Sequence, residues 1–323
     1  MQIQGVQIDD TFAEAFRTWA CRLIVTAVDR SWVDVAARTV TGYATSVIGC
    51  DAEAGLERYL ESAETPDGRP GAALLFFSFK PEPLGKAVAN RVGQCLLTCP
   101  TTAVYDGLPG VTKTDDSARL DVGKQLRFFG DGFQKSKVMA RSRPSSPPGW
   151  THMAGLVSER YWRIPVMDGE FVVSENCGAI KAIAGGNFLV CGSDQRTTLA
   201  ATQRAVEAIA PLPEVITPFP GGIVRSGSKV GSRHKKLVAS TNEAYCPTLR
   251  GRRGVTSRLP DAAGCVYEIV INGLNEAAIA AAMCTGIRAA CVDGIAAISA
   301  GNYGGKLGKF HFHLRKVMSE AAT

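Results

Sequence analysis

The stretch Gly264-Cys-Val-Tyr-Glu-Ile-Val-Ile-Asn-Gly273 has the composition of a buried β-strand. β-Branched and aromatic residues form one short run, and a glycine stands at each end. Glu268 is the exception: it lies between Tyr267 and Ile269, where carboxylates are rarely buried without a partner. The strand therefore predicts a carboxyl group in apolar surroundings.

Two roles for Glu268 are compatible with such a strand. Burial disfavours the charged form and raises the pKa, so the carboxyl can hold a proton near neutral pH. It can then donate a hydrogen bond to a developing oxyanion or act as a general acid. The alternative is an ion pair with an arginine or lysine of a neighbouring strand. From the strand alone the ion pair is favoured, because structural ion pairs are common.

Length and composition indicate a globular protein with two domains or lobes. The chain has 323 residues, of which 46% are hydrophobic and 20% charged. Its first residues lack the features of a secretory signal, and no apolar run reaches the roughly 20 residues of a membrane span. We therefore expect a cytoplasmic protein without a membrane partner, whose ten cysteines stay reduced. The net charge of +6 indicates an acidic partner only where basic residues cluster.

The first part of the chain carries the pattern of a βαββαβ unit. Strands are predicted at residues 21–28, 44–50, 71–79 and 101–105, with helices at 31–42 and 84–99. Residues 10–16 predict a short helical turn with Asp10 as its N-cap. Ser31 and Asp34 have the spacing of a capping box at the start of the first helix.

The same order returns in the last part of the chain. Strands are predicted at residues 186–191, within 215–224, around Glu268 and at 295–299, with helices at 199–209 and from Asn275 to Cys291. The repeat predicts an α+β fold of two ferredoxin-like lobes related by duplication. The lobes are residues 1–123 and 181–323. Residues 124–180 are predicted to be inter-lobe strands with a basic insertion rich in proline and serine.

Standard catalytic motifs are absent from the sequence. There is no Walker A loop, no GxGxxG motif and no GxSxG turn between a strand and a helix. His311 and His313 have no nearby cysteine or carboxylate cluster to complete a zinc site. The cysteines on predicted helix faces are expected to pack in the core. We therefore expect neither a metal site nor a covalent intermediate.

Polar, glycine-rich passages flank the Glu268 strand. Residues 219–232 and 240–248 precede it, and residues 298–308 begin at the end of the strand predicted at 295–299. Asn302 and Tyr303 repeat the pairing of asparagine and aromatic ring seen at Asn187 and Phe188. Such loops can wrap a polar ligand with backbone N–H groups and hydroxyls. A plain surface linker is an equal alternative on composition alone.

The sequence resembles the formylmethanofuran:tetrahydromethanopterin formyltransferase family. The matching stretches are residues 10–16, 64–71, 93–95, 128–133, 185–188, 219–231, 239–248, 265–276 and 299–308. The resemblance implies two ferredoxin-like lobes, assembled as a dimer or a tetramer. It also implies formyl transfer between the amine of methanofuran and N5 of tetrahydromethanopterin. Both carriers are then substrates, and no metal or prosthetic group is used.

The family's proposed catalytic carboxylate falls on Glu268, which reverses the preference for an ion pair. Its protonated carboxyl would stabilise the oxyanion of a tetrahedral intermediate, while positioning of both carriers in a ternary complex does most of the rest. The glycine-rich passages and a basic run supply the expected substrate-binding residues. These are Asn187, Phe188, Ser226, Ser228, Lys229, Lys235, Lys236, Ser240, Thr241, Asn242, Tyr245, Arg252, Asn302 and Tyr303.

Two features depart from the archaeal members of the family. Residues 135–161 form an insertion, and the chain is basic where the archaeal proteins are acidic. Both features resemble the bacterial formyltransferase subunit of a formyltransferase/hydrolase complex, which implies hydrolase subunits as partners and formaldehyde oxidation to formate in methylotrophy. Trp150, Tyr161 and Trp162 are expected to be aromatic anchors of the insertion at a partner or a neighbouring protomer.

Two other classes of function remain open. A non-catalytic scaffold subunit would keep the fold. A basic ferredoxin-like nucleic-acid binder is disfavoured, because residues 74–79 lack the pattern of an RNA-recognition strand. The basic run from Arg225 to Arg253 has Glu243 as its one acidic residue. It is either a solvated face or a track for the γ-glutamyl tail that the resemblance implies for the furan carrier.

Overall fold

The computed structural model describes residues 1–142 and 156–320. The chain divides into two compact units, of which unit 1 comprises Met1–Arg17 with Ile183–Thr323, and unit 2 comprises Thr18–Ala182. Two long strands, β3 (Phe12–Thr26) and β11 (Cys177–Gly192), each run from one unit into the other. These boundaries differ from the predicted ones, because the first 17 residues pair with strands of the C-terminal part and residues 124–180 belong to unit 2.

Unit 2 begins with a βαββαβ order. Its elements are β3, α1 (Arg30–Thr41), β4 (Glu53–Leu60), β5 (Gly71–Ser78), α2 (Pro81–Arg91) with a following π-helix (Val92–Leu96), and β6 (Ala103–Asp106). The strands pair antiparallel in the order β4-β5-β3-β6. The remaining elements are β7 (Ser117–Leu120), α3 (Val122–Leu126), β8 (Lys135–Ser142), β9 (Leu156–Val166) and β10 (Gly169–Ser174). β10 extends the sheet beside β6, and β9 and β8 follow.

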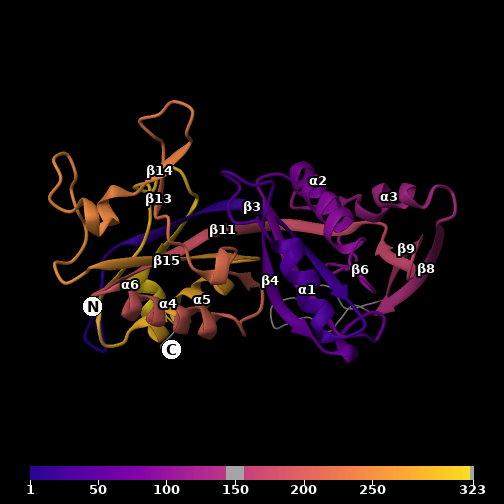
Figure 1. The fold of residues 1–323 in the computed structure, drawn as a ribbon, viewed down its shortest axis with the longest axis horizontal. Helices are drawn as coiled ribbons and strands as arrows, with labels where there is room; N and C mark the ends of the chain where they lie inside the picture. The colour runs from indigo at the N-terminus through magenta and orange to yellow at the C-terminus, as the bar shows by residue number, and fades with distance from the viewer. Residues whose placement is uncertain (143–155, 321–323) are drawn as a thin grey trace. The chain divides into compact units, whose positions relative to one another are not determined.

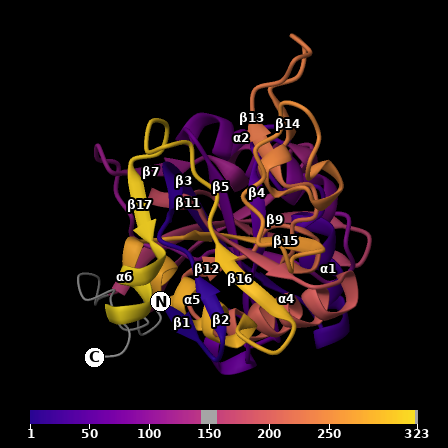
Figure 2. The same cartoon turned by 90° about the vertical axis from the view of Figure 1, so that its left-hand side faces the viewer.

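Unit 1 contains the same order of elements. They are β11, α4 (Gln195–Ile209), β12 (Val215–Ile216), β15 (Cys265–Gly273), α5 (Glu276–Ala290) and β16 (Ile295–Ser299). The strands pair in the order β12-β15-β11-β16. The other elements are β1 (Gln2–Ile3), β2 (Val6–Ile8), β13 (Ser228–Val230), β14 (Ala239–Thr241), β17 (Phe310–His313) and α6 (Leu314–Glu320). β2 pairs with β16, and β17 pairs with the first part of β3 (Figure 2).

Side-chain caps fix where three helices begin. Asn275 caps α5, as predicted, by accepting a hydrogen bond from the Ala278 N–H at 2.8 Å. Asp194 caps α4 in the same way. The cap of α1 is Asp29, which accepts from the Trp32 N–H at 3.0 Å, so the predicted capping box at Ser31 was placed two residues too late.

Two other local predictions were wrong, and a third was confirmed in part. Residues 12–16 are part of β3 rather than a helical turn, because pairing with β17 overrides the local preference. Residues 44–50 form turns closed by hydrogen bonds such as Cys50 N–H to Ser46 O at 2.8 Å, and the strand begins at Glu53. Within 215–224, strand pairing lies on both sides of the predicted turn: β12 precedes it, Gly221 and Gly222 make the turn with positive φ values of 61° and 76°, and Val224 forms an isolated antiparallel bridge with Glu268.

The two faces of the unit 1 sheet are covered differently. Phe188 and Ile269 belong to the core that α4 and α5 cover, whereas Leu189 packs with Tyr245 and Leu259. β13 and β14 lie on the other side of β15 from α4 and α5 in both views (Figures 1 and 2). No helix in the described part of the chain is long and apolar enough to span a membrane.

Candidate functional site

Glu268 lies in the middle of β15, with a backbone neighbour on each side. Leu189 of β11 pairs with it on one side. On the other side, the Val224 N–H donates to Glu268 O at 2.7 Å, and the Glu268 N–H donates to Val224 O at 3.0 Å. Ser299 of β16 continues this row beyond Leu189. Side chains in one row across a sheet point to the same face, so Glu268 faces the side of Leu189 and Tyr245, away from α4 and α5.

The Glu268 carboxyl has no counter-charge among the residues that the structure describes. Its side chain is partly buried, and burial raises its pKa to about 7. Among the residues that the structure describes, neither a hydrogen bond nor an ion pair reaches this carboxyl. The ion pair considered from the sequence is therefore not found in this part of the chain. A carboxyl of this kind exchanges its proton near neutral pH.

A loop after β16 is fastened to unit 1 by two asparagines. The Gly301 N–H donates to Asn187 Oδ1 at 2.6 Å, and Asn187 Nδ2 donates to Gly301 O at 3.1 Å. Asn302 Nδ2 donates to Thr11 Oγ1 and Phe12 O at 3.1 and 3.0 Å. Both side chains are thus engaged in holding the loop.

Glu14 is another carboxyl of unit 1, fully buried, that the sequence did not indicate as a site residue. Its carboxylate oxygens accept hydrogen bonds from four backbone N–H groups, those of Tyr303, Gly305, Leu307 and Gly308. The signal that revealed Glu268, a carboxylate within a short apolar run, is also present in Phe-Ala-Glu-Ala-Phe at residues 12–16. The predicted helical turn obscured it.

Tyr303 connects the two carboxyls. Burial raises the pKa of the Tyr303 phenol, and the negative charges of Glu268 and Glu14 raise it further. The phenol is therefore neutral at physiological pH and lies within electrostatic reach of Glu268. Tyr303 is thus a predicted substrate-binding residue whose pKa is raised by the charge of Glu268.

The passage before β15 contributes polar groups whose partners are mostly within the passage. Lys229 forms an ion pair with Glu243 at 2.5 Å, and Ser240 Oγ donates to Gly231 O at 2.7 Å. The Asn242 N–H donates to Gly227 O at 2.6 Å. The Tyr245 hydroxyl shares a 3.1 Å hydrogen bond with Ser299 Oγ, in the row of Glu268. Tyr245 therefore fixes this passage against the face on which Glu268 lies.

The other predicted residues divide into exposed and core positions. Ser226, Ser228, Lys235, Lys236, Thr241 and Arg252 are exposed. Phe188 is fully buried in the core beneath α4 and α5, so the prediction that it binds substrate needs correction. Successive residues of a strand point to opposite faces, which places Asn187 on the face of Glu268 and Phe188 on the helix face.

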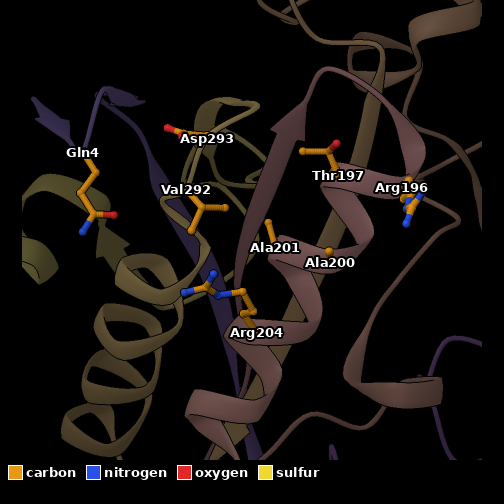
Figure 3. Close-up of a pocket in the computed structure, with 8 residues that line it drawn as sticks. All are labelled: Gln4, Arg196, Thr197, Ala200, Ala201, Arg204, Val292 and Asp293. Atoms are coloured by element: carbon orange, nitrogen blue, oxygen red, sulfur yellow. The ribbon is translucent and has the colours of Figure 1, made fainter.

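A surface pocket of unit 1 lies on α4, with Gln4, Arg196, Thr197, Ala200, Ala201, Arg204, Val292 and Asp293 around it (Figure 3). None of the predicted site residues lines it. Within residues 1–142 and 156–320, no group of three or more histidines, cysteines and carboxylates is placed to hold a metal ion.

Comparison with known proteins assigns the chain to an acyl-transferring enzyme family. The family model described as "Formylmethanofuran-tetrahydromethanopterin formyltransferase" matches residues 1–148, and the one described as "FTR, proximal lobe" matches residues 169–317. The formylmethanofuran–tetrahydromethanopterin formyltransferase of Methylococcus capsulatus is 51% identical, over 99% of this chain and all of that protein. The chain therefore belongs to the formylmethanofuran–tetrahydromethanopterin formyltransferase family.

Similar proteins occur in bacteria and in archaea. A subunit of the formyltransferase/hydrolase complex of Methylorubrum extorquens is 47% identical over 99% of this chain and 98% of its own length. The crystal structure of that complex with methylofuran contains a chain that superimposes with a TM-score of 0.88 and covers 98% of both chains. The formyltransferase of Methanosarcina barkeri superimposes with a TM-score of 0.87 at 46% identity, over 98% of this chain and all of that one.

Proposed function

We propose that this protein transfers a formyl group between N5 of tetrahydromethanopterin and the amine of methanofuran or an analogue. The observation that carries the proposal is the partly buried carboxyl of Glu268, whose pKa is about 7 and which has no partner among the described residues. Membership of the family over nearly the full chain length supports it. Both carriers act as substrates.

The reaction proceeds by addition and elimination in a ternary complex. The lone pair of the acceptor amine attacks the formyl carbon, and the carbonyl electrons move to oxygen to give a tetrahedral oxyanion. The oxyanion then collapses, the bond to the donor nitrogen breaks, and that nitrogen takes up a proton while the acceptor nitrogen loses one. A protonated Glu268 donates a hydrogen bond to the oxyanion, and its pKa near 7 suits it to hand a proton to the leaving nitrogen.

We also infer that the two units are ferredoxin-like lobes related by duplication. β4-β5-β3-β6 in unit 2 and β12-β15-β11-β16 in unit 1 have the same strand order and the same antiparallel pairing. In both, the first and third strands of the unit are each followed by a helix. An independent origin of two identical orders in one chain is less economical than duplication.

The proposed activity is tested directly with the two carriers. Purified protein is mixed with formyl-methanofuran and tetrahydromethanopterin, or with formyl-tetrahydromethanopterin and methanofuran, and formyl transfer is followed by absorbance. Turnover is expected with both pairs. Absence of turnover in both directions, from a protein that still joins its complex, would identify a scaffold subunit instead. Binding of single-stranded RNA to a filter would favour the nucleic-acid alternative.

We further propose that the protein is the formyltransferase subunit of a complex with hydrolase subunits, and that it forms a dimer or tetramer. The similarity to a subunit of the Methylorubrum formyltransferase/hydrolase complex supports the first part. Formate release by the hydrolase would place the protein in cytoplasmic formaldehyde oxidation. The tip of the insertion, residues 143–155 with Trp150, lies outside the described residues.

The other two predicted anchors of the insertion differ in their burial. Tyr161 is buried, packs edge-on against the Tyr105 ring, and donates its hydroxyl hydrogen to Glu159 at 2.7 Å. Trp162 packs against the unit 2 core and under the Arg127 guanidinium. The buried Tyr161 holds β9 in place, which corrects the expectation that it forms an interface. The partly buried Trp162 stays a proposed contact.

Exposed phenylalanines next to this hairpin are the better candidates for a partner contact. Phe128, Phe129 and Phe133 are 68%, 65% and 77% exposed. We predict that the double variant Phe129→Ser with Phe133→Ser binds the hydrolase subunits about tenfold or more weakly, because apolar anchors dominate interfaces. A smaller fraction of it should co-elute with these subunits on size exclusion. Ile48→Ser, at another exposed apolar side chain of unit 2, is the control. Unchanged co-elution of the double variant would contradict the prediction.

The basic run is proposed to hold the acidic tail of the furan carrier. Lys229 and Arg250 are unsuitable for this, since Lys229 is paired with Glu243 and Arg250 donates to the carbonyls of Pro260, Asp261 and Ala263. The exposed cations Lys235, Lys236 and Arg252 remain available. Each cation near a chain of carboxylates adds a modest, salt-sensitive attraction.

Charge reversal tests this proposal. Lys235→Glu with Lys236→Glu and Arg252→Glu is expected to raise the Michaelis constant for the long-tailed carrier by about tenfold, with a weaker salt dependence. Furfurylamine, which has no tail, should be affected little. Reversal of the exposed Lys86, Lys113 and Arg204 changes the net charge equally and is the control. Equal effects on both amines would mean that the basic run is surface charge and does not bind the tail.

A further inference from the structure

Glu14 occupies a cage of backbone N–H groups. Its side chain is 1% exposed. Oε2 accepts from the N–H groups of Tyr303 and Gly305 at 2.7 and 2.9 Å, and Oε1 accepts from those of Leu307 and Gly308, each at 2.6 Å. Burial alone would raise the pKa of Glu14, but these bonds hold it below its usual value. Glu14 is therefore a buried carboxylate, stabilised by amides in place of a cation.

The loop is shaped to wrap this one side chain. Gly304 and Gly305 have positive φ values of 72° and 73°, in a turn that directs the N–H groups of Tyr303 and Gly305 toward the carboxylate. A Cβ atom at Gly308 would lie 2.5 Å from Ala15 O and 2.7 Å from Glu14 Cγ. Glycine is thus required at position 308 by the close approach of the loop to β3.

Glu14 holds most of the loop beyond Asn302, whose Oδ1 accepts one further hydrogen bond, from the Gly304 N–H at 3.1 Å. Asn187 fixes Gly301, and Asn302 binds Thr11 and Phe12. From Tyr303 to Gly308, the backbone is anchored to β3 by the four bonds to Glu14, and His311 Nε2 lies 3.2 Å from Gly308 O. Tyr303 itself is tied to β3 by the hydrogen bond from its N–H to Glu14, and its ring lies 6.3 Å from that of Phe16.

We propose that Glu14 is a positioning residue for formyl transfer: it orders residues 303–308 so that the Tyr303 phenol faces Glu268 and donates a hydrogen bond at the reacting formyl group. The proposal rests on the proposed function of Glu268. A neutral phenol near the developing oxyanion is a preorganised donor, and such a donor contributes only if its backbone is held in place. Glu14 itself does not touch the substrate and acts through Tyr303.

A double-mutant cycle separates positioning from plain stability. Glu14→Gln and Tyr303→Phe are each expected to lower kcat by about tenfold or more, with Michaelis constants for both carriers changed about twofold or less. The double variant should be no slower than the slower single variant, because both changes remove the same donor. If Glu14→Gln lowers kcat by the same factor in the native protein and in the Tyr303→Phe variant, the proposal is overturned.

Two further variants test the proposal if Glu14→Gln folds poorly. Gly308→Ala is expected to loosen the same loop and to lower kcat, while Asp106→Asn is the matched control. Asp106 is a buried carboxylate of unit 2 that accepts from the N–H groups of Leu108 and Gly178, and its replacement should lower Tm without lowering kcat.

Hydrogen exchange gives a readout that needs no activity. In Glu14→Gln, the amides of Tyr303, Gly305, Leu307 and Gly308 should lose protection, while those of β15 keep it. Loss of protection without loss of kcat would overturn the positioning role. If the native protein shows no turnover, the proposed function fails instead, and the exchange pattern still tests whether Glu14 orders the loop.

Discussion

Replacement of Glu268 by alanine is expected to lower the rate of formyl transfer by about a hundredfold or more at saturating concentrations of both carriers. Loss of a single oxyanion donor has an effect of this size in other acyl-transfer enzymes. Glu268→Gln keeps a hydrogen-bond donor but cannot give up a proton, so its rate is expected to lie between those of the alanine variant and the native protein. The measurement is the steady-state rate in both directions.

The pH profile identifies the group responsible for this loss. Because the pKa of Glu268 is about 7, the protonated fraction and the oxyanion donor decline as the pH rises through that value. The native rate should fall on the alkaline side, and Glu268→Gln should lack this step. Glu207→Gln, on the exposed face of α4, is the control for loss of a carboxylate. Near-normal turnover of a folded Glu268→Ala protein would mean that Glu268 is structural.

Elements with a strong local signal were predictable from the sequence. The glycine-bounded apolar run gave β15, and Asn275 gave the start of α5, because both depend on neighbouring residues. Residues 12–16 were mistaken for a helical turn because their conformation is set by β17, about 300 residues away along the chain. Local propensity cannot report a partner strand that is distant in sequence.

Of the site, the sequence predicted only those residues that stand out by composition. Glu268 stood out as a carboxylate among apolar residues, and its raised pKa follows from burial. The roles of Asn187 and Glu14 depend on hydrogen bonds to residues 301–308, which no spacing in the sequence reveals. The Asn-aromatic pair suggested two ligand contacts, but strand alternation puts Asn187 and Phe188 on opposite faces of β11.

Glu268→Gln is expected to make the protein more stable than the native form at pH 8. The pKa of Glu268 rises from an ordinary value of 4.5 to about 7 in the folded protein. Between these values the folded state binds more protons than the unfolded state, so the free energy of unfolding falls as the pH rises. Above pH 7 the native protein carries the whole penalty of a charged, poorly solvated carboxylate, and glutamine carries none.

The size of this gain follows from the same two values. A rise from 4.5 to about 7 corresponds to at most about 3 kcal/mol. Because the side chain keeps partial contact with solvent, we expect about 1–3 kcal/mol at pH 8, declining toward zero near pH 4, where both side chains are neutral. Urea unfolding of both proteins at a series of pH values measures the difference, with the exposed Glu207→Gln as a control that should show no such trend.

The sign of the difference decides between the two roles of Glu268. A carboxylate held by a cation is stabilised when charged, so its replacement by glutamine would destabilise the protein at pH 8, with a partner left unpaired. A carboxyl kept in apolar surroundings for proton transfer is destabilising when charged, and its replacement raises stability while lowering activity. A gain in stability that grows as the pH rises from 4.5 to about 7 and is complete above it, together with the loss of turnover, is the combination expected of a catalytic acid. A loss of stability at pH 8 would indicate that Glu268 is held by a cation and has a structural role, with no part in the chemistry.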